Sequence, residues 1–260
     1  MQQRNDNMQT FGDHLEVLRH VFFRIGGIII LFSVLFLSGK EIMWNVLLAP
    51  SESSFCLYSW IENVLSFIGY NYKFDTFEAE FISTELAAQF MAHLSASIGL
   101  AIVFSTPYTL FELFRYISPA LYSNEKSYVR ITLVIIYLCF SIGLLISYFF
   151  IYPLSYRFLS TFSVSERVHA TITIDSYISS FTTITLLMGI FFQLPIITYL
   201  LAKYDIISSN ELCHYRKHAF IAIMIVAAVI TPPDIMTLII VTVPLYMLFE
   251  VSLLVMRFAN

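Results

Sequence analysis

The run ITLVIIYLCFSIGLLISYFFIY, residues 131–152, has no charged side chain and ends directly before Pro153. A helix needs about 20 residues to cross a hydrocarbon core of about 30 Å, so this run predicts a transmembrane helix. Further apolar runs predict spans at residues 21–39, 86–107, 177–201, 218–230 and 235–256. The predicted fold class is therefore all-α, a polytopic membrane protein with six helices in one integral membrane domain, residues 1–260.

The composition supports a membrane protein and excludes several other classes. Of the 260 residues, 58% are apolar, 17% aromatic and only 12% charged, whereas a soluble domain carries about 25% charged residues. The net charge of -4 offers no basic face for nucleic acid. Cys56, Cys139 and Cys213 are far apart, so we expect neither disulfides nor a metal site. Because no HExxH, GxSxG, GxxxxGK[ST] or GxGxxG motif occurs, we expect neither an enzyme nor a cofactor.

The first and the last two predicted spans differ from an average span. The first begins near Val21 and is too long for a cleavable signal peptide, so we expect it to remain in the protein. Residues 218–230 and the uncharged residues 236–249 of the last span are short, since about 14 helical residues cover only about 21 Å. Such short helices must thin the bilayer locally or pack against neighbouring helices. The alternative is a re-entrant hairpin that never crosses.

Basic residues divide unevenly between the two sides of this topology. Ten of the 14 Lys and Arg residues lie before span one, between spans two and three or four and five, or after span six: Arg4, Arg19, Arg24, Arg115, Lys126, Arg130, Lys203, Arg216, Lys217 and Arg257. The other three loops hold Lys40, Lys73, Arg157 and Arg167. Because basic loops stay in the cytoplasm, both termini are predicted to be cytoplasmic, in the inner membrane. The long acidic loop at residues 40–85 should form short amphipathic helices outside.

Residues 111–130, FELFRYISPALYSNEKSYVR, join two apolar runs and place charges among aromatic side chains. The charged residues are Glu112, Arg115, Glu125, Lys126 and Arg130. Since a residue before proline avoids the helical region, Pro119 should push Ser118 toward an extended conformation. We expect a short amphipathic helix, a turn and the start of the next span at the membrane surface. A glutamate there can accept a guanidinium through two hydrogen bonds, and the alternative is an interfacial loop with solvated charges.

Polar side chains within predicted spans are candidates for function, because they are costly in lipid. His93 alternatively satisfies a contact between helices. Gln193 lies two residues before a proline and could bond a freed carbonyl, a water or a partner helix. Asp234 lies in the outer turn ITPPD, where it could also cap the last helix. Glu250 and Arg257 lie seven residues apart on one helix face and are expected to be structural or headgroup anchors.

Several short pieces of sequence occur in a characteristic order. They are FGDHLEVLR at 11–19, SPALYSNEK at 118–126, FFQLP at 191–195, ITPPD at 230–234, and LFE and RF at 248–250 and 257–258. Each piece is weak alone, but their order and spacing around six spans resembles the TatC family, the core receptor of the twin-arginine protein translocase. The resemblance extends from about Phe11 to Phe258.

The resemblance implies an architecture, a function and partners. TatC proteins have six spans that form a concave cup in the membrane, with both ends in the cytoplasm. They bind signal peptides with paired arginines on proteins that are already folded. They work in homo- and hetero-oligomers with single-span partners of the TatA and TatB type, and the proton-motive force drives transport. Lipid and these proteins, not nucleic acid, are the partners that it implies.

The resemblance also implies site residues. The signal-binding glutamate of the family matches Glu125, and the aromatic residue, the proline and the leucine before it match Tyr116, Pro119 and Leu121. The HLxELR motif matches His14, Leu15, Leu18 and Arg19. Its central glutamate falls on Val17, so a second anionic contact would depend on the preceding Glu16.

Two further positions match polar residues of the family. Its polar residue in span four, often glutamate, is Gln193 here, so an obligatory titrating carboxyl is not expected. Its outer-turn aspartate matches Asp234, which follows Pro232 and Pro233. The alternative function is a small-solute or ion transporter whose pathway uses Gln193 and His93, although the two halves show no matching pair of broken helices. A membrane scaffold without a translocation role is a third possibility.

Overall fold

The structure is a computed structural model that describes residues 11–70, 74, 81–83, 85–121, 126–162, 171–203, 206–207, 209–231 and 234–257. The long helices are α1 (Phe11–Ser38), α4 (Ala88–Leu121), α5 (Lys126–Ile146), α7 (Ile174–Phe191) and α11 (Ile235–Arg257). The shorter helices are α2 (Lys40–Leu48), α3 (Cys56–Phe67), α6 (Tyr152–Thr161), α8 (Leu194–Lys203), α9 (Ser209–His214) and α10 (Arg216–Ile230). Two helical turns, η1 (Ala49–Ser51) and η2 (Ser147–Ile151), and two parallel strands, β1 (Phe81–Ile82) and β2 (Ile172–Thr173), complete the described elements.

The prediction of an all-α polytopic membrane protein is confirmed. Within the described residues, five helical stretches are long and apolar enough to cross a membrane: Leu15–Ser38, Ala88–Tyr116, Ile131–Thr161, Ile174–Lys203 and Ile235–Arg257. Helix α10 has only 15 residues, which agrees with the short fifth span expected from the sequence. A sixth crossing therefore stays a prediction.

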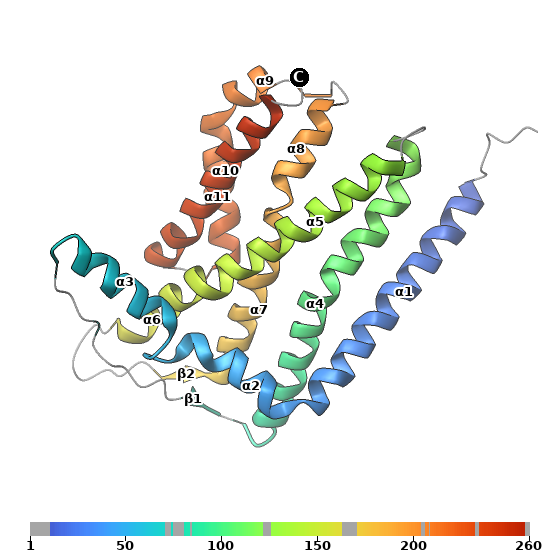
Figure 1. The fold of residues 1–260 in the computed structure, drawn as a ribbon. Helices are drawn as coiled ribbons and strands as arrows, with labels where there is room; N and C mark the ends of the chain where they lie inside the picture. Colours follow the sequence, from blue (N-terminus) through green and yellow to red (C-terminus); the bar gives the residue numbers. More distant parts are fainter. Residues whose placement is uncertain are drawn as a thin grey trace, which may run out of the picture.

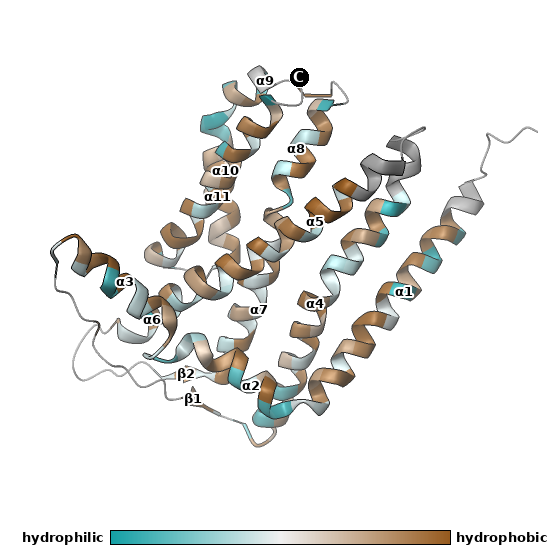
Figure 2. Ribbon diagram, viewed as in Figure 1, coloured by the Kyte–Doolittle hydropathy of each residue, from teal (hydrophilic) through white to brown (hydrophobic). Residues whose placement is uncertain are grey.

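The helices are arranged in a fan that Figure 1 shows from the side. Helix α1 packs along α4, both α4 and α5 pack on α7, and α8 and α10 pack on α11. The start of α1 and the end of α11 lie at the same end of the molecule, and α2, α3, β1 and β2 lie at the other end. Hydrophobic residues run along most of α1 and α5 (Figure 2). Many of them face outward, such as Phe23, which is 72% exposed, as expected of a surface that contacts lipid.

Helix α4 is longer than the sequence predicted. It runs unbroken from Ala88 to Leu121, whereas the sequence predicted an end at Pro107 and an extended Ser118 before Pro119. Pro107 has no N–H, so the carbonyl of Val103 four residues earlier loses its helical partner. The other backbone bonds of α4 remain, because in lipid no water can replace them. The predicted interruption at Pro119 and the separate surface helix before it are therefore wrong.

The third span also continues past the proline that was expected to close it. Helix α5 passes into the π turn η2 and then into α6, whose second residue is Pro153. Proline has no N–H, so it cannot donate to the carbonyl of Phe149 four residues earlier. The wider π turn takes up this mismatch, and the chain stays helical to Thr161.

The described part of the loop at residues 40–85 forms short helices, as the sequence predicted, and side-chain contacts fix α3 to the bundle. Tyr58 of α3 donates a hydrogen bond to the carbonyl of Pro153, at 3.0 Å. The Arg157 guanidinium lies 4.9 Å from the centre of the Tyr58 ring. Burial raises the pKa of Tyr58 to about 12, against the lowering effect of Arg157. The phenol is therefore neutral at physiological pH and keeps its proton for this bond.

His93 holds the ends of three helices together. Trp44 Nε1 of α2 donates to His93 Nδ1 at 3.3 Å, and His93 Nε2 lies 3.3 Å from the carbonyl oxygen of Leu37 in α1. Because Nδ1 accepts a hydrogen bond, Nε2 carries the proton and donates to Leu37. Both ring nitrogens are therefore occupied by contacts within the protein. This geometry agrees with the contact between helices that was one of the two readings of His93.

Candidate functional site

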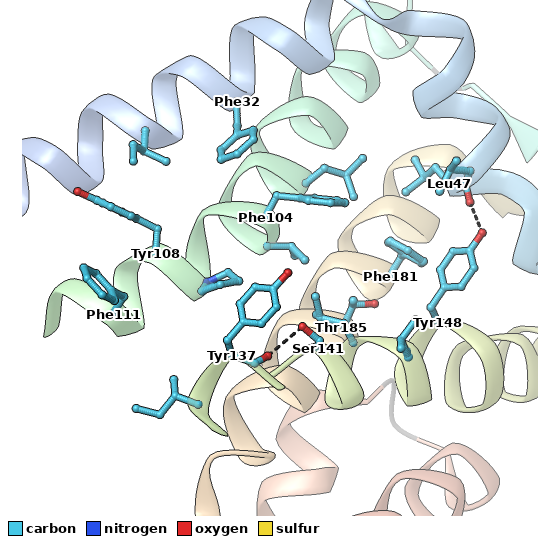
Figure 3. Close-up of a pocket in the computed structure, with 18 of the residues that line it drawn as sticks. Phe32, Leu47, Phe104, Tyr108, Phe111, Tyr137, Ser141, Tyr148, Phe181 and Thr185 are labelled. Atoms are coloured by element: carbon cyan, nitrogen blue, oxygen red, sulfur yellow. Dashed lines mark hydrogen bonds between the residues drawn. The ribbon is translucent and has the colours of Figure 1, made fainter. Parts of the chain in front are cut away.

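A large apolar groove of about 930 Å³ lies between α1, α2, α4, α5 and α7. Figure 3 shows that Phe32, Phe104, Tyr108 and Tyr137 point into it from three different helices. Its few polar groups include the hydroxyl of Thr185. Many polar groups bond within the protein: Ser141 Oγ donates to the carbonyl of Tyr137 at 2.9 Å, and Tyr148 donates to that of Val46 at 2.9 Å. The groove therefore suits an apolar occupant.

One end of the groove carries a buried carboxylate. Glu112 is only 4% exposed, and it follows Phe111, which lines the groove. Arg24 Nη1 of α1 lies 3.4 Å from each carboxylate oxygen of Glu112, and the Tyr108 hydroxyl donates to Oε1 at 2.8 Å. The sequence indicated Glu112 only as one of several loop charges. Its partner Arg24 lies 88 residues away in the sequence. The one feature that could have indicated this pair was an arginine near the start of an apolar run.

The structure describes only part of the predicted peptide site. Glu125 lies outside the described residues, as do Pro232 and Pro233. Pro119 and Leu121 belong to the last turn of α4, but their side chains are outside the description. Tyr116 follows Glu112 by four residues, which places it one turn further along the same face of α4.

The start of α1 carries the other predicted contacts. Glu16 and Arg19 are exposed there, and Val17, where the family motif has a glutamate, is 50% exposed. Helix α1 begins at the end of the molecule at which α4 finishes (Figure 1). The fold therefore brings Glu16, Arg19 and Tyr116 to one end of the bundle, the end that also holds Glu112.

Gln193 occupies a break between α7 and α8. Its Nε2 donates to the carbonyl oxygens of Ile136 in α5 and Gly189 in α7, both at 3.3 Å. The residue is 5% exposed, and within the described part of the chain its Oε1 has no hydrogen-bond partner. Gln193 thus ties two helices together and also leaves one buried acceptor, which a water or a partner helix could satisfy.

The remaining polar candidates have structural partners. Asp234 caps α11, because its Oδ1 accepts from the backbone N–H of Thr237 at 2.7 Å and its Oδ2 from the Thr237 hydroxyl. Glu250 of α11 accepts from Arg216 of α10 at 2.8 Å. Both groups therefore stabilise the pair α10 and α11. Helix α11 has 23 residues, so of the two last spans that the sequence predicted to be short, only α10 is short. Among the described residues, no group of three His, Cys, Asp or Glu side chains could hold a metal ion.

Comparison with known proteins gives a consistent result. The family model described as "Sec-independent protein translocase protein (TatC)" matches residues 13–244. The chain is 29% identical to the TatC protein of Blattabacterium sp. over 95% of this chain and 94% of that protein. It is 34% identical to TatC of Helicobacter pylori strain J99 over 79% of this chain and 80% of that protein. The crystal structure of the "Twin Arginine Translocase Receptor- TatC" superimposes with a TM-score of 0.75 and 25% identity, covering 95% of this chain and 99% of that one.

Proposed function

Because the chain belongs to the TatC family of Sec-independent protein translocase proteins, we propose that it is the signal-peptide receptor of a twin-arginine translocase. It binds the paired-arginine signal peptides of folded cargo proteins. It then recruits single-span partners of the TatA and TatB type, in homo- and hetero-oligomers. The proton-motive force drives transport, and each charge that crosses contributes about 2.3 kcal/mol per 100 mV.

The observation that carries this proposal is an apolar groove that ends at a charged end of the bundle. A signal peptide has the same two parts, an apolar segment and a pair of arginines in front of it. The groove accepts the apolar segment, and its aromatic walls give the contact area. The paired arginines then lie where α1 begins and α4 ends, close to the acidic residues of both.

Glu125 is proposed as the main contact of the paired arginines. A carboxylate distinguishes arginine from lysine, because the planar guanidinium forms two parallel hydrogen bonds that an ammonium cannot copy. Tyr116, Pro119 and Leu121 shape the surface beside it. Glu16 and Arg19 contribute from the start of α1, where Glu16 supplies the anionic charge that Val17 lacks.

The orientation follows from the basic residues, and it can be measured. With both termini in the cytoplasm of an inner-membrane protein, a cysteine introduced at Asn71 should react with an impermeant reagent added outside. Cysteines at Asn124 and Asn210 should react only after the inner face is opened. Labelling of position 124 from outside would overturn this orientation.

Gln193 is proposed to hold a partner helix through its buried carbonyl oxygen. Gln193→Leu should weaken partner association by about 1 kcal/mol or less for each lost hydrogen bond. Gln193→Glu should keep activity, because the TatC family tolerates glutamate at this position. Thr198→Val is the matched control, since the Thr198 hydroxyl donates to the carbonyls of Leu194 and Pro195 in its own helix. Co-purification with partners measures the effect, and normal partner binding and transport by the Leu variant would make Gln193 a packing residue.

The rival function is a small-solute or ion transporter that uses His93 and Gln193. The bonds of both side chains to neighbouring helices argue against a water-filled pathway through them. Two assays of the purified protein separate the functions. Receptor activity predicts that a peptide with paired arginines binds in nanodiscs more tightly than its paired-lysine counterpart. Solute uptake into liposomes by the protein alone would favour the transporter. Equal affinity for the paired-arginine and paired-lysine peptides would refute the receptor proposal.

A further inference from the structure

The ion pair between Arg24 and Glu112 combines a buried carboxylate with a loose partner. The Glu112 side chain is 5% exposed, whereas that of Arg24 is 55% exposed. One nitrogen of Arg24 lies 3.4 Å from both carboxylate oxygens. A forked guanidinium contact uses two nitrogens at about 2.7–2.9 Å. Arg24 therefore neutralises Glu112 without forming the contact that the guanidinium allows.

A second ion pair in the same protein gives the comparison. Glu250 also has an arginine on a neighbouring helix and a tyrosine four residues earlier, Arg216 and Tyr246. There the arginine lies at 2.8 Å, and the glutamate side chain is 34% exposed. A buried carboxylate benefits more from a close partner than an exposed one does, because water screens it less. The longer contact thus occurs at the more buried glutamate, which is the reverse of what a purely structural ion pair predicts.

Glu112 is also connected to the groove. The groove is lined by Tyr108, which donates to Glu112, by Phe111 beside it, and by Ile28, one turn along α1 from Arg24. A peptide whose apolar segment lies in the groove therefore contacts the residues that surround the ion pair. The peptide residues that precede the apolar segment then lie at the charged end of the bundle, where they reach the position of the exposed Arg24.

We propose that Glu112 is a carboxylate of the peptide site that binds arginine. It pairs with Arg24 while the site is empty, and it pairs with an arginine of the peptide when the peptide binds. The inference rests on the proposed receptor function. Exchange of one guanidinium for another leaves Glu112 paired, so binding does not incur the cost of a buried unpaired charge. Arg24 is half-exposed and can turn away into water or toward headgroups. Glu112 thereby supplies a further anionic contact, in addition to those proposed for Glu125 and Glu16.

Three variants and one control test the exchange, with a synthetic peptide that carries paired arginines before an apolar segment. Arg24→Asn removes the competing guanidinium and leaves Glu112 in need of a partner, so affinity should rise about tenfold. Glu112→Gln should lower affinity at least about tenfold. In the double variant Arg24→Asn/Glu112→Gln, which keeps a polar contact, the gain from Arg24→Asn should disappear. Arg216→Asn breaks the matched ion pair on α10 and α11 and should leave peptide affinity unchanged.

Thermal unfolding separates exchange from a purely structural clamp. Arg24→Asn should lower the midpoint of unfolding, and the paired-arginine peptide should restore it more than the paired-lysine peptide does. A clamp between α1 and α4 predicts the same loss of stability, no gain in affinity and no selective restoration, and that result would overturn the inference. If wild type prefers paired arginines while affinity is the same in all Arg24 and Glu112 variants, the exchange is refuted and the receptor function stands. If wild type shows no arginine preference, both are refuted together.

Discussion

Replacement of Glu125 by glutamine is expected to weaken binding of a paired-arginine peptide by about 1.5–3 kcal/mol, the usual range for hydrogen bonds to a charged group. Glutamine keeps the size of the side chain and removes the charge that the guanidinium needs. Glu125→Asp should be intermediate, since the charge stays but retreats by one methylene. Peptide affinity in nanodiscs at low and moderate salt measures the effect, and the loss should be smaller at higher salt.

Two controls accompany this prediction. A paired-lysine peptide should be nearly indifferent to the change, because it has little forked contact to lose. Glu52→Gln removes an equivalent charge from an exposed position between η1 and α3, and this variant should bind the peptide as wild type does. Equal affinities for wild type, Glu125→Gln and Glu125→Asp would remove Glu125 from the site and leave Glu16 and Glu112 as the acidic contacts.

Gly143→Ala is expected to destabilise the fold by more than the 1–3 kcal/mol that is typical of overpacking. Helix α5 passes α7 at this glycine, and an added Cβ would lie 2.8 Å from the carbonyl oxygen of Met188 and 2.9 Å from Cα of Gly189. Both are backbone atoms, so the contact is relieved only if the two helices separate. Because α5 and α7 both line the groove, peptide binding should fall together with stability.

Gly27→Ala is the matched control for this substitution. A Cβ at Gly27 of α1 would meet no atom within 4 Å, and alanine is a better helix former than glycine by about 1 kcal/mol. Thermal unfolding of purified Gly27→Ala should equal or exceed that of wild type, whereas Gly143→Ala should unfold at a lower temperature. An unchanged midpoint for Gly143→Ala would show that α5 and α7 do not approach each other closely there.

The class of the protein and the places of its spans were predictable, because each span is decided by a local apolar run. The errors occur at prolines. Pro119 and Pro107 lie inside α4, and Pro153 lies inside the third helical stretch. At Pro107 and Pro153, which lie within candidate membrane spans, the helix keeps its remaining backbone bonds because lipid offers no water to replace them. Pro119 lies in the last turn of α4, beyond the candidate span Ala88–Tyr116, so this reason does not apply to it.

The site was only partly predictable for a different reason. Spacing identifies residues on one helix, but it does not say which helices pack together. The pairing of Glu112 with Arg24 depends on the contact between α1 and α4, across 88 residues. A contact between helices for His93 and a helix cap for Asp234 were each among the predicted alternatives. The hydrogen-bond partners in the structure favour these structural roles. The role of Glu125 rests on resemblance and stays a prediction.

A photocrosslinking amino acid at position 125 tests the central claim most directly. The full-length variant is reconstituted in nanodiscs and irradiated with a labelled signal peptide whose paired arginines precede its apolar segment. The receptor account predicts a crosslink to residues next to the arginines, which excess unlabelled paired-arginine peptide removes and paired-lysine peptide does not. A crosslink that both competitors remove equally, or its absence from position 125 while the same peptide crosslinks elsewhere on the protein, would contradict the account.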